Sequence, residues 1–71
     1  MNLDAYQLAM QRIDSEFDLP QYIVSGLIRE IQANRGRLPT DEQRRYKHLP
    51  AAVLTRIEAI VRETFGIGMG H

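Results

Sequence analysis

The sequence predicts an all-α fold, a compact bundle of about four helices at residues 3–17, 20–34, 40–47 and 50–65, with a tri-helical core and a packed N-terminal helix. Two observations support this prediction. Apolar residues recur at helical spacing in the three long segments. Prolines and glycines fall between the segments, where helices begin and end.

The N-terminal segment carries apolar residues at alternating spacings of three and four, which is typical of a helix packed along a narrow seam. These residues are Leu3, Tyr6, Met10, Ile13 and Phe17. Two heptads are too short for an independent coiled coil, so we expect this helix to lie on the core of the domain. The alternative is that the same residues form the seam of a homodimer.

The second helix is expected to open at Pro20, with Asp18 as its cap, and to end near Asn34, where Gly36 can adopt the left-handed conformation. Its apolar face consists of Ile23, Val24, Leu27, Ile28 and Ile31. Gly26 lies in the middle of this helix, where glycine costs about 1 kcal/mol relative to alanine. Either another helix crosses closely at Gly26, or the glycine is simply tolerated.

The third helix is predicted to begin with a capping box in which Thr40 and Gln43 satisfy each other's backbone donors. It ends near Lys47, and Pro50 suits the first turn of the fourth helix. The apolar face of the fourth helix consists of Val53, Leu54, Ile57, Ile60, Val61 and Phe65. Its polar residues, Arg56, Glu58, Arg62 and Glu63, are expected in solvent, and Gly66 ends it.

Length and composition limit the classes of protein. With 71 residues, no cysteine and zero formal net charge, the chain is predicted to form one domain at residues 1–66, followed by a flexible tail at residues 67–71. The absence of cysteine excludes disulfides and thiolate chemistry and fits a reducing compartment. No apolar run is long enough to span a membrane and no basic leader precedes one, so we expect a cytoplasmic protein without a membrane partner.

Residues for chemistry are sparse. The only imidazoles are His48 and His71, one at a helix boundary and one in the tail. The serines, threonines and glycines match no nucleophile or phosphate-loop motif. We therefore expect no enzyme, and no catalytic, metal or cofactor site.

Charge is distributed unevenly along the chain. Residues 1–19 are mainly acidic, whereas residues 35–48 form a basic unit. The cations of this unit are Arg35, Arg37, Arg44, Arg45 and Lys47. They could contact nucleic acid or an acidic partner, form a solvated face, or complement the acidic helix in the same or a neighbouring subunit.

These observations predict a binding protein. The chain has many apolar side chains for its length, so we expect a partner to cover part of the apolar surface. We expect a small interaction or regulatory module that binds and modulates another protein and forms a homodimer. The alternative is a helix-turn-helix-like DNA-binding regulator that uses the basic unit. Mixed charge on the fourth helix, a candidate recognition helix, argues against this alternative.

One succession of short motifs runs through residues 23–65: Leu27-Ile28-Arg29-Glu30-Ile31, Asn34-Arg35-Gly36-Arg37-Leu38-Pro39, Arg44-Arg45, His48-Leu49-Pro50 and Ile57-Glu58. With these motifs, residues 23–65 resemble a helical segment found C-terminal to the catalytic core in some bacterial Fic-family proteins. The catalytic Fic motif, a histidine followed by a Gly-Asn-Gly-Arg phosphate loop, is absent. The resemblance therefore implies an accessory or docking module and no nucleotidyl transfer.

Overall fold

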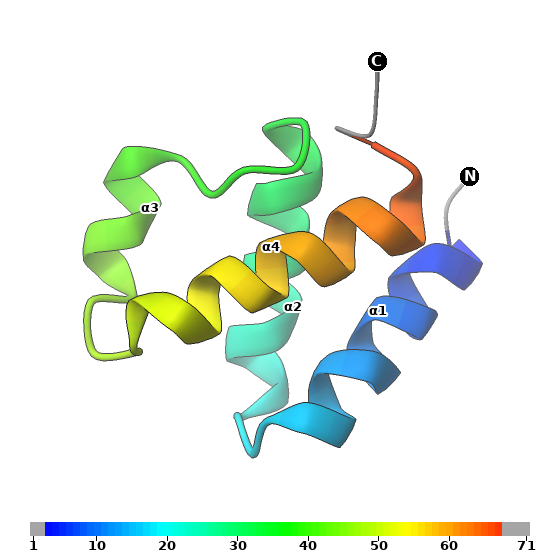
Figure 1. The fold of residues 1–71 in the computed structure, drawn as a ribbon, viewed down its shortest axis with the longest axis horizontal. Coiled ribbons are helices and arrows are strands. Elements are labelled where there is room, and N and C mark those ends of the chain that lie inside the picture. The colour runs from blue at the N-terminus through cyan, green and yellow to red at the C-terminus, as the bar shows by residue number, and fades with distance from the viewer. Residues whose placement is uncertain (1–2, 68–71) are drawn as a thin grey trace.

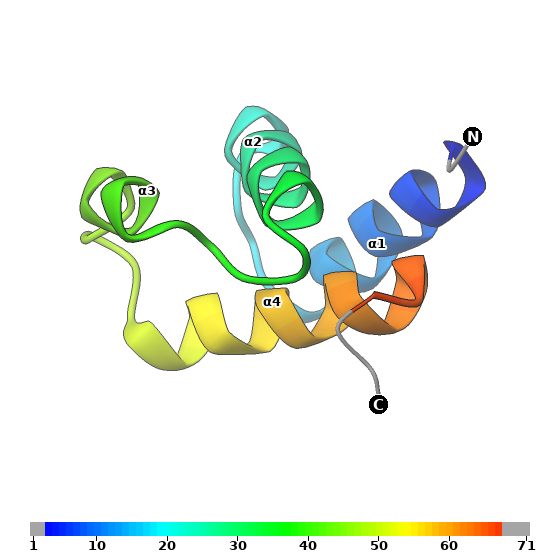
Figure 2. The same ribbon diagram turned by 90° about the horizontal axis from the view of Figure 1, so that it is seen from above.

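The computed structural model describes residues 3–67, which form four α-helices (Figure 1). These are α1 (Leu3–Glu16), α2 (Gln21–Ala33), α3 (Thr40–Arg45) and α4 (Ala51–Phe65). α4 packs against both α1 and α2, which also contact each other. Figures 1 and 2 show α3, α2 and α1 following one another along the length of α4. The predicted all-α fold is confirmed, and every helix boundary lies within two residues of its predicted position.

The core lies mainly between α2 and α4. Its fully buried side chains include Val24, Leu27, Ile28 and Ile31 from α2, and Ile57, Ile60 and Val61 from α4. α1 adds Ala9 and Ile13 to this core. The two central helices are therefore those whose sequences carry the broadest apolar faces, as expected.

The apolar seam of the N-terminal segment packs against the core of its own chain. Ile13 is fully buried, and Tyr6, Met10 and Phe17 pack against the core. The hydroxyl of Tyr6 also hydrogen-bonds that of Ser25 on α2. This arrangement is the one expected for a helix laid on the domain core; the side chain of Leu3 lies outside the described residues.

The helix starts differ from prediction. Pro20, Pro39 and Pro50 are the N-cap residues of α2, α3 and α4, each in an extended conformation and without a side-chain hydrogen bond at the cap. The predicted cap by Asp18 is therefore wrong. The predicted capping box of Thr40 is also wrong, because Thr40 is already helical.

The helix ends follow the predicted glycines more closely. α4 ends at Gly66, which has a φ of 68°, and the N–H of Ile67 donates to the carbonyl of Arg62 at 3.1 Å. After α2, Gly36 has a φ of 98° and donates its N–H to the carbonyl of Ile31 at 2.7 Å. At the C-terminal ends of both helices, a glycine with a positive φ thus provides the cap. Ile67 thus continues the C-terminal cap, and the rest of the predicted flexible tail, residues 68–71, lies outside the described residues.

The short helix α3 has no buried residue of its own. Tyr46, directly after it, is only 8% exposed, and its hydroxyl oxygen lies 3.0 Å from where a Cβ on Gly26 would be. Of the two alternatives for Gly26, the structure thus shows a close neighbour, but it is a tyrosine side chain rather than a crossing helix. Burial raises the pKa of the Tyr46 hydroxyl, and the nearby carboxylate of Glu42 raises it further.

Candidate binding surface

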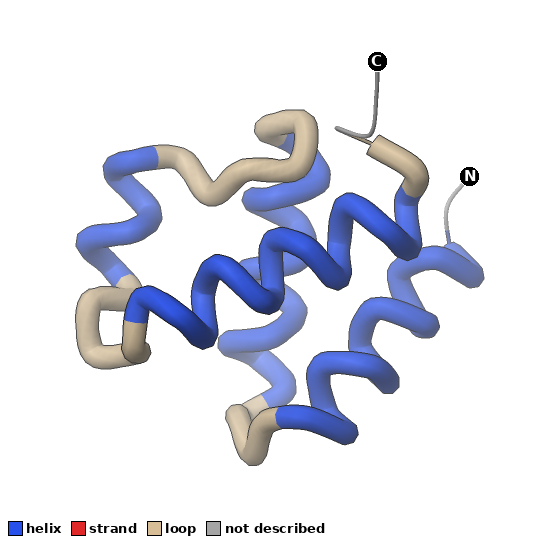
Figure 3. Tube along the Cα trace, viewed as in Figure 1, coloured by secondary structure: helices blue, strands red, loops and turns tan. Residues whose placement is uncertain are grey.

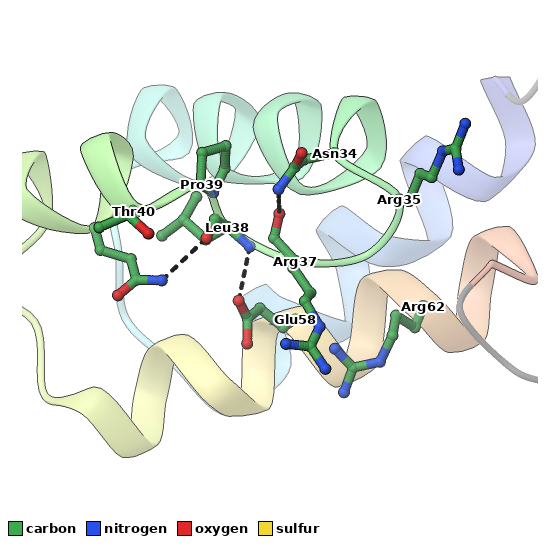
Figure 4. A pocket seen from close by; sticks show the side chains of 9 residues that line it. Asn34, Arg35, Arg37, Leu38, Pro39, Thr40, Glu58 and Arg62 are labelled. Carbon is green, nitrogen blue, oxygen red and sulfur yellow. Dashed lines mark hydrogen bonds between the residues drawn. The ribbon is translucent and has the colours of Figure 1, made fainter.

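The loop between α2 and α3, drawn in tan in Figure 3, borders a hollow of about 710 Å³. One side of the hollow is this loop with the start of α3, and the other is the middle of α4 (Figure 4). It is lined by Asn34, Arg35, Arg37, Leu38, Pro39, Thr40, Gln43, Glu58 and Arg62. The structure therefore brings two members of the predicted basic unit together with two residues of α4.

Side chains from all three neighbouring helical segments hold the loop. The N–H of Leu38 donates to Oε2 of Glu58 at 2.7 Å, and Nε2 of Gln43 donates to the carbonyl of Leu38 at 3.0 Å. The amide of Asn34 donates to the carbonyl of Arg37 at 3.0 Å. Leu38, a residue of this loop, is itself buried. The backbone that carries Arg37 is therefore fixed on both sides, since its own carbonyl and the next N–H are both bound.

Arg62 is held against Gly36. Its Nη1 donates to the carbonyl of Gly36 at 2.8 Å, and its aliphatic stem covers the glycine. A Cβ on Gly36 would lie 2.6 Å from Cγ and 2.9 Å from Cδ of Arg62. Because Gly36 has no side chain, the stem of Arg62 can pack directly on the loop backbone at this residue.

The arginines of the hollow differ in direction. Figure 4 shows the side chains of Arg37 and Arg62 on the α4 side of the loop, whereas Arg35 points away from it. Within residues 3–67, the ion pairs join Arg12 with Glu63, Arg45 with Glu42, and Arg56 with Glu16. None of the three arginines of the hollow takes part in them.

The remainder of the basic unit lies on α3 and the turn after it. Arg44, Arg45 and Lys47 are exposed, and only Arg45 has a carboxylate partner in the described chain, Glu42 at 3.4 Å. No described ion pair joins the basic unit to the acidic helix α1. The described ion pairs therefore do not support the interpretation that the basic unit complements α1 within the same chain.

Two ion pairs instead join α1 to α4. Glu16 accepts two hydrogen bonds from the guanidinium of Arg56, at 2.9 and 2.7 Å, and Arg12 donates to Glu63 at 2.8 Å. The hydrogen bond from Arg56 lowers the pKa of the Glu16 carboxyl, and Glu16 in turn raises the pKa of Arg56. These two pairs lie across the α1–α4 interface, so they fix charges that would otherwise be available to a partner.

The sequence reasoning missed Glu58 and Arg62, which it placed in solvent. Both are partly buried and contact the α2–α3 loop. Their spacing of four residues puts them on one face of α4, which is the signal that could have grouped them. Their contact with residues 36 and 38 depends on the tertiary fold.

Between residues 3 and 67, no cluster of three or more histidine, aspartate or glutamate side chains is arranged to hold a metal ion. In that part of the chain no helix combines the length and apolar character needed to cross a membrane. Comparison of the chain with protein-family models, curated proteins and solved structures finds no match. The resemblance to a Fic-family segment stays a prediction.

Proposed function

We propose that this chain is a non-enzymatic binding module that docks an acidic segment of another protein on its basic surface. The basic surface consists of Arg35, Arg37, Arg44, Arg45, Lys47 and Arg62. One observation carries the proposal: the described arginines of the hollow have no carboxylate partner, whereas those of the α1–α4 interface do. Guanidinium groups without partners are suited to carboxylates, which they bind through paired hydrogen bonds.

The charges around the basic surface favour a protein over nucleic acid. On α4, Arg56 is engaged by Glu16, while Glu58 faces the hollow. The first turn of α3 adds Asp41 and Glu42. A nucleic acid would bring a dense row of phosphates close to these carboxylates, and like charges repel. An acidic peptide can place its few charges on the arginines alone.

A second copy of the chain is the other partner that the sequence suggests. A homodimer would have to use a surface other than the α1 seam, because Ile13 is buried and the remaining described seam residues pack against the core. Leu8 and Tyr22 are the large apolar side chains that are exposed among the described residues, at 48% and 78%. Two such side chains offer little apolar area for a stable dimer, so we favour a foreign acidic partner over self-association.

The proposal is tested by fluorescence anisotropy with the full chain and three labelled probes: a peptide rich in glutamate, the same peptide with glutamine in place of glutamate, and duplex DNA. We expect binding of the acidic peptide only, weakening as salt is added. Arg37→Glu and Arg44→Glu should each weaken it. Arg29→Glu, an equal charge change on the exposed side of α2, is the matched control.

Two results would overturn the proposal. One is duplex DNA binding more tightly than the acidic peptide, which would favour the DNA-binding alternative. The other is an equal loss of peptide affinity in Arg29→Glu and Arg37→Glu, which would mean that only overall charge matters.

A further inference from the structure

We propose that Glu58, although acidic, is a positioning residue that strengthens the docking of an acidic peptide by holding Arg37 in place. The inference rests on the proposed function, because Arg37 is one of the cations of the basic surface. It is carried by the hydrogen bonds that hold the loop backbone on both sides of Arg37.

Arg37 is an exposed residue between two buried ones. Gly36 before it and Leu38 after it are both buried, whereas Arg37 itself is open to solvent. A cation in this place is accessible to a partner, while its two neighbours are fixed in the molecule. The direction of its side chain therefore depends on how the two flanking peptide groups are held.

The peptide group before Arg37 is bonded at both of its polar atoms. The carbonyl of Gly36 accepts from Nη1 of Arg62 at 2.8 Å. The N–H of Arg37 donates to the carbonyl of Asn34 at 3.4 Å. Since a peptide group is planar, these two bonds fix its orientation.

The peptide group after Arg37 is bonded in the same way. The carbonyl of Arg37 accepts from Nδ2 of Asn34 at 3.0 Å, and the N–H of Leu38 donates to Oε2 of Glu58 at 2.7 Å (Figure 4). With both flanking planes held, the φ and ψ angles of Arg37 are fixed as well.

The bond to Glu58 is the shortest of these four, and its acceptor is charged. Hydrogen bonds to an ionised acceptor are roughly twice as strong as neutral ones. Leu38 is only 3% exposed, so without Glu58 its N–H would be a buried donor left unpaired. The loop would then have to shift until this N–H reaches water, and Arg37 would shift with it.

A carboxylate on α4 also repels an acidic partner, but salt screens this repulsion over a distance of about 8 Å at physiological ionic strength. A loop that is not held must be ordered when the partner binds, which costs conformational entropy at several residues. The two effects of Glu58 on affinity have opposite signs, and we expect the ordering of the loop to dominate.

The test compares two variants of the full chain by fluorescence anisotropy with the glutamate-rich peptide. Glu58→Ala removes the charge and the acceptor, whereas Glu58→Gln removes the charge but keeps an oxygen that can accept from Leu38. We expect Glu58→Ala to weaken peptide binding on the order of tenfold. Glu58→Gln should bind at least as tightly as the unmodified chain. If Glu58 acted through its charge alone, both variants would bind more tightly.

NMR of the same variants reports the state of the loop. The Leu38 amide should lose protection from hydrogen exchange in Glu58→Ala and keep most of it in Glu58→Gln. The amides of Leu27 and Ile28 in the core should keep their chemical shifts, which shows that the domain is still folded. Asp41→Ala removes the same charge from an exposed position on α3, and as the matched control it should not weaken peptide binding.

A second background shows whether Glu58 acts through Arg37. In Arg37→Gln the residue that Glu58 positions has lost its charge, so adding Glu58→Ala should no longer weaken peptide binding. An effect of Glu58 on the fold as a whole would persist in this background.

Three outcomes would overturn the positioning role: peptide binding by Glu58→Ala that is no weaker than in the unmodified chain, equal affinities of Glu58→Ala and Glu58→Gln, or an undiminished loss in the Arg37→Gln background. The first of these leaves the docking function standing, because the unmodified chain still binds the peptide. If the unmodified chain binds no acidic peptide, both the docking function and the positioning role are wrong.

Discussion

The side-chain stem of Arg62 lies so close over Gly36 that a Cβ on the glycine would be 2.6 Å from Cγ of the arginine. Gly36→Ala should therefore force Arg62 to move and break its hydrogen bond to the Gly36 carbonyl. Together with the strain of a φ of 98°, this should lower the free energy of unfolding by about 1–3 kcal/mol, measured by urea denaturation.

Gly66→Ala is the matched control for that change. Gly66 also has a positive φ, 68°, but nothing lies within 4 Å of the place where its Cβ would be. Only the left-handed backbone penalty of about 1 kcal/mol should remain. Equal losses in the two variants would show that Arg62 is not packed on Gly36.

The contact between Gly26 and Tyr46 predicts that Gly26→Ala destabilises the chain when the Tyr46 hydroxyl is present and stabilises it when the hydroxyl is removed. Gly26→Ala should destabilise the chain because the new methyl group meets the Tyr46 hydroxyl at 3.0 Å. In a Tyr46→Phe background the obstacle is gone, and alanine should stabilise α2 by up to about 1 kcal/mol through helix propensity. A double-mutant cycle followed by thermal denaturation measures this coupling. Additive effects would contradict it.

Two core positions test the choice of α2 and α4 as the centre. Leu27 and Ile57 are fully buried. Leu27→Ala or Ile57→Ala should each cost about 2–5 kcal/mol, enough to unfold much of so small a domain at room temperature. Tyr22→Ala, at a side chain that is 78% exposed, is the control and should have little effect. A melting temperature that hardly moves in both core variants would refute this assignment.

The ion pair of Glu16 and Arg56 predicts a pH dependence. The hydrogen bond from Arg56 lowers the pKa of Glu16 below its ordinary value of 4.5 in the folded chain. Because the folded pKa is below the unfolded one, the stabilisation is present above that ordinary value and is lost as the pH falls through the folded pKa.

The stability difference between the unmodified chain and Arg56→Gln should thus be present at neutral pH and vanish in acid. It should also shrink at high salt, since both side chains are partly exposed. Arg29→Gln, at an exposed arginine outside the described ion pairs, should show no such pH dependence. Chemical denaturation across the acid range makes the comparison.

Local sequence signals predicted the helices well, because apolar spacing and the Leu-Pro and glycine breaks act over a few residues. They placed Leu27 and Ile57 in the core correctly. They failed at Thr40, whose capping box matches in sequence, because Pro39 occupies the cap and the amide of Gln43 turns to the Leu38 carbonyl. A motif of residue types does not fix which residue first becomes helical.

The candidate site was only half predictable. Arg35 and Arg37 stood out as part of a basic unit, but Arg37 shares the hollow with Arg62 only because α4 packs beneath the α2–α3 loop. Contacts between residues so far apart along the chain leave no local pattern. Arg35, which points away from the others in Figure 4, has a left-handed backbone with a φ of 60°, and the sequence pattern did not predict this either.

The way α3 is attached has a consequence for the amide hydrogen exchange of the chain. α3 has no buried residue, and the side chains that pack on the core lie before and after it, at Leu38, Tyr46 and Leu49. Its amides should therefore exchange through local openings that cost less free energy than those of α2 and α4. The part of the basic surface on α3 can then adjust its position, while Arg62 and the loop that it holds stay fixed against the core.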